Sequence, residues 1–250
     1  TMMDDTFNDS EHKINEFLKM SQSLPFKLEY GAYIRADLVC RFEGMAEKLV
    51  ESGLRGAFFG IESLHPTASV VIGKGWSGKE AREYVPTLVH SIWSDKVSVQ
   101  CGLIVGLPGE THEDLYNTLQ WANDNNINVI FFGLQVTNNL HERVYISEFE
   151  KNADQYGFKF DKLGKWYSDD WSRDKVVDVA MQLNRGRTKL NYSGFINLAL
   201  RSLKFTHEDI ESTHSSKMVQ RNLEFRTNKQ QFLDEYFNQL TEVCDNAQFN

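Results

Sequence analysis

The feature that most constrains the fold is a strand, a glycine loop and a helix that follow one another directly. Residues 97–105 are largely apolar and β-branched, which is typical of a strand buried on both faces in a parallel sheet. Gly-Leu-Pro-Gly at 106–109 ends this strand, because glycine permits positive φ and proline removes a backbone donor. Thr111 is a suitable N-cap for a helix over 111–125. In α/β folds such a loop lies at the carboxyl edge of the sheet, where ligands bind; alternatively, it is only a tight turn.

Strand and helix patterns alternate through the first half of the chain. The predicted strands lie near residues 1–5, 28–35, 56–62, 97–105 and 128–135. The predicted helices between them include 41–52, 78–94 and 111–125. This alternation indicates an α/β fold with mostly parallel strands joined by right-handed crossovers. A closed eight-stranded barrel needs more strands than these, so we expect an incomplete (β/α) TIM-like barrel over residues 1–137.

Local signals predict where two of these helices begin and where one is disturbed. Asn8 or Asp9 is a suitable N-cap for the first helix. Ser77 and Glu80 have the spacing of a capping box at the start of the helix over 78–94. Pro86 lies inside that helix, so we expect the helix to be kinked or split there.

After residue 137 strand signals become rare and helical patterns dominate. The predicted helices lie at 140–156, 173–186, 190–203 and 216–244. Residues 138–250 are therefore predicted to form a helical C-terminal region. An aromatic and acidic loop between the first two helices contains Trp166, Tyr167 and Trp171. These side chains either line a substrate pocket or pack the C-terminal region onto its core, and the second role is the more common one.

The composition excludes several classes of function. The net charge of −8 argues against general binding of nucleic acid, which needs a basic surface. The three cysteines lack the spacing of a disulfide framework, which indicates a reducing compartment. Neither a membrane-spanning apolar run nor a signal-peptide pattern is present, so we expect a soluble cytoplasmic protein. His65, His112 and His141 do not have metal-ligand spacing, so no zinc site is predicted.

Six short segments carry polar or glycine residues at or near the predicted strand and helix ends. They are Asp4-Asp5-Thr6-Phe7, Arg35-Ala36-Asp37, Glu51-Ser52-Gly53, Gly60-Ile61-Glu62-Ser63, Gly73-Lys74-Gly75 and Gly106-Leu107-Pro108-Gly109-Glu110-Thr111. In this order and spacing they resemble the radical S-adenosylmethionine (SAM) superfamily, in particular the branch that often carries a cobalamin-binding domain.

The resemblance implies that SAM binds at the carboxyl edge of the sheet. The implied cofactor-binding residues are Arg35, Gly60, Glu62, Gly106, Leu107, Pro108 and Gly109. In this interpretation Arg35 binds the methionyl carboxylate. Asp4 and Asp5 are weak candidates for residues that orient substrate or ribose hydroxyls.

Each of these assignments has a structural alternative. Glu62 would instead satisfy the backbone of a long loop predicted at 63–78. Arg35 would form a salt bridge to Asp37 or Glu62. Asp4 and Asp5 would belong to a solvated strand end or a helix cap. Lys74, in the long loop, would either meet an anion or be a solvated lysine.

The cysteines depart from the family pattern. Its hallmark is a Cys-x3-Cys-x2-Cys loop that holds a [4Fe–4S] cluster, whereas Cys40, Cys101 and Cys244 are widely separated. We therefore interpret the chain as a partial barrel without this N-terminal segment, and Cys101 as a small core residue. The chain alone is predicted to bind no cluster and not to cleave SAM reductively, since a cluster needs several converging thiolates.

Three functional hypotheses follow. The first is a fragment of a radical SAM enzyme acting on a small molecule or an unknown substrate, with the [4Fe–4S] cluster only in the full-length protein and cobalamin as an optional cofactor. The second is a cluster-free binding or scaffold protein on the same half-barrel. The third is an unrelated α/β enzyme that binds a phosphate ester at residues 109–111, where a helix begins.

The predicted partial barrel leaves an unpaired strand at residues 1–5. Unpaired backbone groups and an uncovered apolar lining favour association. We expect either a homodimer through residues 1–8 and strand 28–35, which is slightly favoured, or a monomer in which residues from 190 onward cover this edge.

Overall fold

The computed structural model describes residues 6–73, 75–136 and 151–188, together with Met2, Asp4, Asp234, Phe237, Asn238 and Thr241. A four-stranded sheet forms the centre of this part, in the order β1-β2-β3-β4. The strands are β1 (Tyr30–Ile34), β2 (Leu54–Glu62), β3 (Ser98–Val105) and β4 (Val129–Gly133). All three neighbouring pairs are parallel, which confirms the predicted α/β fold.

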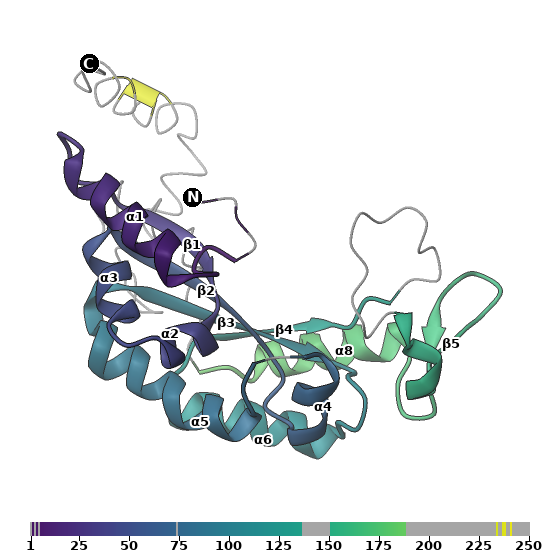
Figure 1. The fold of residues 1–250 in the computed structure, drawn as a ribbon. Helices are drawn as coiled ribbons and strands as arrows, with labels where there is room; N and C mark the ends of the chain where they lie inside the picture. The colour runs from purple at the N-terminus through teal and green to yellow at the C-terminus, as the bar shows by residue number, and fades with distance from the viewer. Residues whose placement is uncertain are drawn as a thin grey trace.

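Helices connect successive strands, as parallel pairing requires. They are α2 (Ala36–Arg41), α3 (Met45–Glu51), α4 (Pro66–Val71), α5 (Gly78–Thr87), the π-helix η1 (Leu88–Trp93), the 3-10 helix η2 (Ser94–Lys96) and α6 (His112–Asp124). A further helix, α1 (Glu11–Ser23), precedes β1. Figure 1 shows α5 and α6 running side by side along the sheet. The core holds alternate residues of β2, namely Ala57, Phe59 and Ile61, all of which are buried.

The N-terminal segment lies along β1. The backbone N–H of Met2 donates to the carbonyl of Gly31 at 2.8 Å, and that of Phe7 donates to Tyr33 at 3.1 Å. Thr1, Met3 and Asp5 lie outside the described residues, so the predicted strand over 1–5 stays a prediction.

Ser10, rather than Asn8 or Asp9, is the N-cap of α1, and its side chain accepts from the backbone N–H of Lys13. The prediction was wrong because Asn8 has another role. Its side chain is fully buried and bonds to the backbone of Arg35.

Two other predicted elements are divided differently in the structure. The predicted helix over 41–52 is two helices, α2 and α3, with Gly44 between them at a φ of 72°. The predicted loop over 63–78 contains the short helix α4. Pro66 at its first position needs no N–H donor, and the side chain of His65 accepts from the backbone N–H of Ala68.

The predicted capping box of Ser77 and Glu80 at the start of α5 is confirmed. Pro86 neither breaks the helix nor leaves its partner carbonyl unsatisfied. Because Pro86 has no N–H, the carbonyl of Arg82 loses its usual helical donor, and the indole N–H of Trp121 donates to it at 3.3 Å. The helix then continues directly as the π-helix η1, so Pro86 changes its geometry without ending it.

The chain after residue 151 is built onto the end of the sheet. It contains η4 (Ala153–Tyr156), an antiparallel pair β5 (Lys159–Phe160) and β6 (Trp166–Tyr167), and α8 (Arg173–Arg185). The predicted helix over 173–186 is confirmed as α8, and the side chain of Ser172 caps it. The short β5–β6 pair was not predicted, since the segment around Trp166 was interpreted as a loop.

The other predictions for this half fall largely outside the described residues. They include most of the helix over 140–156, the helices over 190–203 and 216–244, and the domain boundary near 137. Within the described ranges, no helix is long and apolar enough to cross a bilayer.

Candidate functional site

The carboxyl edge of the sheet contains a cavity of about 400 Å³. Three of the predicted cofactor-binding residues, Arg35, Gly60 and Glu62, line it. Thr6, Tyr33 and Phe58 also line it. The rings of Tyr33 and Phe58, which are register partners on β1 and β2, meet at 5.4 Å between centroids. The cavity therefore has an aromatic side and a charged rim, and its volume suits a small organic ligand.

The backbone directs Glu62 toward this cavity. Glu62 ends β2 with a φ of 65°, a conformation that costs free energy for a residue with a side chain. The pairing register with β3 also shifts between Gly60 and Glu62, as in a β-bulge. Bulges turn a side chain away from the direction that regular pleating would give it. The carboxylate is therefore placed at the cavity by an irregular strand end, which the sequence pattern did not indicate.

Arg35 forms the salt bridge to Asp37 that was the structural alternative. Its Nε lies 3.0 Å from Oδ1 of Asp37 and its Nη2 lies 2.5 Å from Oδ2. This bidentate pair raises the pKa of Arg35, and Asp37 itself is buried. The Arg35 side chain still lines the cavity and is 42% exposed.

The loop around Gly75 covers this ion pair. A Cβ at Gly75 would come within 2.3 Å of Oδ2 of Asp37 and 3.2 Å of Nη2 of Arg35. A side chain at this position would therefore have to displace the Asp37 carboxylate. The position of Lys74, the adjacent candidate for an anion contact, lies outside the described residues.

Asp4 is engaged by its own segment. Its Oδ2 accepts from Nζ of Lys13 at 2.7 Å, and its Oδ1 accepts from the backbone N–H of Thr6 at 2.9 Å. The first of these bonds is the main reason that the pKa of Asp4 is lowered. Asp5, the second candidate of this pair, lies outside the described residues.

The loop over 106–109 packs against other parts of the chain. Gly106 and Gly109 have φ of 101° and 82°, so both need glycine. A Cβ at Gly106 would meet Val176 and Trp166, and Leu107 is buried. Among the described residues that line the 400 Å³ cavity, none comes from this loop.

A phosphate at residues 109–111 would find few free donors. Thr111 and Asp114 form a capping box, in which Oδ2 of Asp114 accepts from the Thr111 N–H at 2.9 Å. The Thr111 hydroxyl in turn accepts from the Asp114 N–H at 3.2 Å. A carboxylate therefore already occupies the place where an anion would bind the start of α6.

The two tryptophans of the aromatic segment have a packing role. Trp166 and Trp171 are buried. Their indole N–H groups donate to the carbonyls of Leu134 at 3.1 Å and Glu110 at 3.0 Å. These bonds attach the segment after β5 to the loops that follow β4 and β3. Tyr167, between them, is exposed.

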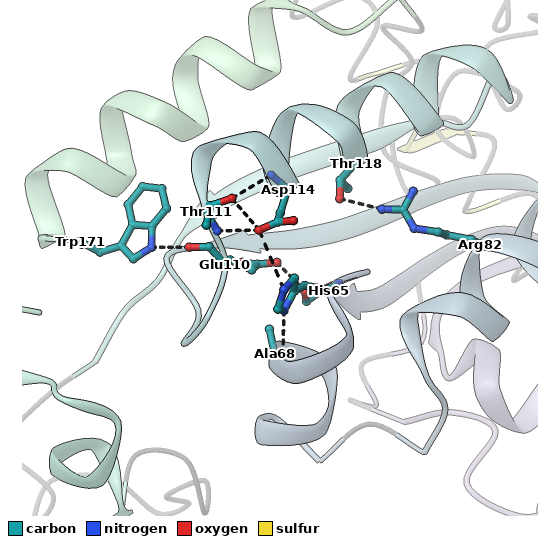
Figure 2. A network of polar contacts seen from close by, with 9 residues as sticks. His65, Ala68, Arg82, Glu110, Thr111, Asp114, Thr118 and Trp171 are labelled. Carbon is teal, nitrogen blue, oxygen red and sulfur yellow. Dashed lines mark hydrogen bonds and ion pairs between the residues drawn. The ribbon is translucent and has the colours of Figure 1, made fainter. Parts of the chain in front are cut away.

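Glu110 is the functional candidate that sequence reasoning missed. It is 5% exposed, and its Oε1 accepts from the hydroxyl of Ser63 at 2.5 Å. Its Oε2 has no hydrogen-bond partner among the described residues. Burial is the main cause that raises the pKa of Glu110 to about 7. Figure 2 shows this carboxylate between the Thr111–Asp114 capping box and His65.

The described cysteines do not fit an iron–sulfur cluster. Cys40 is exposed on α2, whereas Cys101 is buried within β3, where burial raises its pKa to about 12. Cys244 lies outside the described residues. Within the described ranges no group of three or more His, Cys, Asp or Glu side chains is placed to hold a metal ion.

Comparisons with known proteins give structural similarities only. No protein-family model matches the chain, and no curated protein matches it. One similar structure is the radical SAM methyltransferase TsrM from Kitasatospora setae with tryptophan substrate and a SAM analogue, at 16% identity and a TM-score of 0.48, covering 72% of this chain and 42% of that chain. Another structure of TsrM, with cobalamin and a [4Fe–4S] cluster, has 17% identity and a TM-score of 0.43, covering 52% and 25%.

A third similar structure is coproporphyrinogen III oxidase (HemN) from Escherichia coli, described as a radical SAM enzyme. It has 16% identity and a TM-score of 0.43, and the alignment covers 65% of this chain and 41% of that chain. The present chain therefore spans less than half the length of each of these structures.

Proposed function

We propose that this chain is the SAM-binding part of a radical SAM enzyme. The observation that carries the proposal is the convergence of Arg35, Gly60 and Glu62 on one cavity at the carboxyl edge of a parallel sheet. The ordered sequence segments select these residues, and the folded chain brings them together although β1 and β2 are separated by two helices. SAM supplies a 5′-deoxyadenosyl radical when a [4Fe–4S] cluster reduces it.

The residues of this chain would bind and orient SAM. The Glu62 carboxylate would accept hydrogen bonds from the ribose hydroxyls or from the ammonium group. Arg35 would meet the methionyl carboxylate through Nη1, since Nε and Nη2 already bond to Asp37. Phe58 and Tyr33 offer an apolar wall for the rest of the ligand. The loop over 106–109 would shape the edge beside the cavity.

The reductive chemistry belongs to residues outside this description. The two described thiols do not fit a cluster, because Cys40 is exposed and Cys101 is buried. A cluster and any cobalamin would be held by other parts of a longer protein, as would a small-molecule or other substrate. A Cys-x3-Cys-x2-Cys segment in the upstream coding sequence would support the interpretation as an enzyme fragment over that as a cluster-free binding protein.

Calorimetric titration with SAM and with S-adenosylhomocysteine tests the binding role directly, because neither measurement needs a cluster. We expect Glu62→Gln to weaken binding about tenfold, the loss of one charge-assisted hydrogen bond. Glu51→Gln on α3 removes the same charge at an exposed position and serves as the matched control. Equal affinities of wild type and Glu62→Gln, or no binding by wild type, would contradict the proposal.

A further inference from the structure

A second cavity of about 230 Å³ lies in the outer helical layer, between α4, α5 and α6. None of its lining residues lines the first cavity. Two of them are cations, Lys79 and Arg82, and both come from α5. Their spacing of three residues places them on the same face of that helix. The opposite wall is α6, which contributes Asp114, Asn117 and Thr118.

Arg82 is held in place with most of its donors unused. Within the described part of the chain its guanidinium makes one hydrogen bond, a long one of 3.4 Å to the hydroxyl of Thr118. It also lies 5.8 Å from the ring centroid of Trp121. Guanidinium has five N–H donors, and partial burial of a charge is costly when they are not satisfied. This burial lowers the pKa of Arg82.

The position of Arg82 is fixed from the backbone as well. The Trp121 ring contacts the side chain of Arg82, and the Trp121 indole N–H donates to the backbone carbonyl of Arg82. This carbonyl is the group that Pro86 leaves without a helical donor. A rigid guanidinium loses little entropy on binding a ligand. Figure 2 shows Arg82 reaching Thr118 beside the Asp114 carboxylate.

The charges of the cavity favour an anion. Lys79 is exposed, and no ion pair to it is formed by the described residues. Asp114 opposes the two cations, but its Oδ2 accepts from the Thr111 N–H and hydroxyl and lies 3.9 Å from Nε2 of His65. The two positive charges therefore exceed the one negative charge.

We propose that this second cavity binds the phosphoryl group of a small phosphate ester through Arg82 and Lys79. Donors stand on both walls, because Asn117 adds an amide opposite the two cations. Donors from more than one side suit a tetrahedral oxyanion better than a planar carboxylate, and arginine bonds two phosphoryl oxygens at once. The volume accommodates a small ligand or one group of a larger one. The site is independent of the SAM site.

Calorimetric titration of the whole chain with inorganic phosphate and with methyl phosphate, at constant ionic strength, tests the site. We expect Lys79→Gln and Arg82→Gln each to weaken binding about tenfold or more, as loss of a charge-assisted hydrogen bond requires. Arg173→Gln on α8 and Lys159→Gln on β5 remove the same charges at exposed positions and should bind as wild type does. Because Lys79 is exposed, its variant should fold even if Arg82→Gln does not.

Three outcomes would overturn the proposal. One is the absence of binding to wild type, and a second is equal weakening in all four variants, which would indicate nonspecific charge effects. The third is acetate binding as tightly as phosphate, which would assign a carboxylate site instead. Unchanged SAM affinity in Lys79→Gln would show that the two cavities act separately.

Discussion

At each edge of the sheet, the amide of an asparagine bonds to the backbone of the edge strand or of the residue that follows it. The two asparagines differ in how deeply they are buried. At the β1 edge, Asn8 accepts from the Arg35 N–H at 2.7 Å and donates to the Arg35 carbonyl at 2.9 Å. At the β4 edge, Asn184 accepts from the Phe131 N–H at 3.0 Å and donates to its carbonyl at 2.8 Å. Each asparagine amide thus replaces one residue of a neighbouring strand, which limits pairing with another chain.

The surroundings of the two asparagines differ. Asn8 is 0% exposed, and backbone bonds from Met2 and Phe7 continue the closure along β1. Asn184 is half-buried on α8, and the closure along β4 continues through a side chain, Nη1 of Arg187 donating to the Val129 carbonyl. The same amide geometry should therefore contribute more where water has no access, because a lost hydrogen bond then leaves backbone groups unsatisfied.

The largest effect is expected for Asn8→Ala. The substitution leaves the Arg35 N–H without a partner and removes one donor to the Arg35 carbonyl, which still accepts from the backbone N–H groups of Leu38 and Val39. Because the Asn8 amide is fully buried, we expect a loss of about 3 kcal/mol in the free energy of unfolding. Urea denaturation measures it. Asp9→Ala, next to it and exposed, should cost about 0.5 kcal/mol or less. A loss for Asn8→Ala no larger than that of Asp9→Ala would remove the basis of the comparison.

Local sequence signals could not identify this role of Asn8. An asparagine just before a helical pattern predicts an N-cap, whereas its actual partner, Arg35, is 27 residues away. The strands β1 to β4 could be predicted because each has a continuous apolar run between turn residues. Glu110 was missed for the same reason as Asn8, since its partner Ser63 is 47 residues away and the fold alone brings them together.

For the candidate site, the positions of the residues could be predicted from the sequence, whereas some of the detailed geometry could not. The strand ends that carry Arg35 and Glu62 follow from the alternation of elements, because parallel strands present their carboxyl ends at one edge. The pairing of Arg35 with Asp37 is local and was one of the alternatives that the sequence offered. The positive φ of Glu62 depends on register and on packing, which no single segment encodes. The packing of Gly106 against Val176 joins residues from opposite halves of the chain.

Both edges are closed by amide groups, which do not titrate, so the edge bonds should not make the free energy of unfolding depend on pH. A pH dependence is expected from Glu110. Its pKa is raised to about 7 from 4.5, so between these values the folded chain binds more protons than the unfolded chain. The free energy of unfolding should therefore fall as pH rises from about 4.5 to about 7, by at most about 3 kcal/mol.

The difference between wild type and Glu110→Gln across pH 4–8 isolates this contribution from carboxylates with lowered pKa, such as Asp4 and Asp114, which lose stability toward acid. Asn8→Ala should retain the wild-type slope. A slope for Glu110→Gln equal to that of wild type would show that another group titrates in this window.

A smaller effect is expected for Asn184→Ala. Water can reach the Phe131 groups when the half-buried amide is removed, so we expect a loss of about 1 kcal/mol, less than that of Asn8→Ala. The same urea measurement applies, with Asn184→Asp as the matched variant, which keeps an acceptor for the Phe131 N–H but has no donor for its carbonyl. If Asn184→Ala costs as much as Asn8→Ala, burial does not decide the difference between the edges.

The smallest effect is expected for association between chains. Here the edge is uncovered, and the measured quantity is dimer formation instead of stability. Residues 2–8 satisfy the carbonyls of Gly31 and Tyr33 and both backbone groups of Arg35, so a homodimer through this edge would have to displace them. Self-association through the β1 edge stays a prediction. Because residues 2–8 already bond to this edge, we expect association to increase when these residues are removed.

Deleting residues 1–8 should expose the edge and increase the dimer fraction several-fold at a given concentration, since an unpaired strand edge is a template for another chain. Size-exclusion chromatography with light scattering, over a dilution series, measures both chains. Asn184→Ala should increase association less than the deletion does, because it frees the backbone groups of one residue only. A deleted chain that remains monomeric at every concentration at which it stays folded would show that the β1 edge is not an association surface.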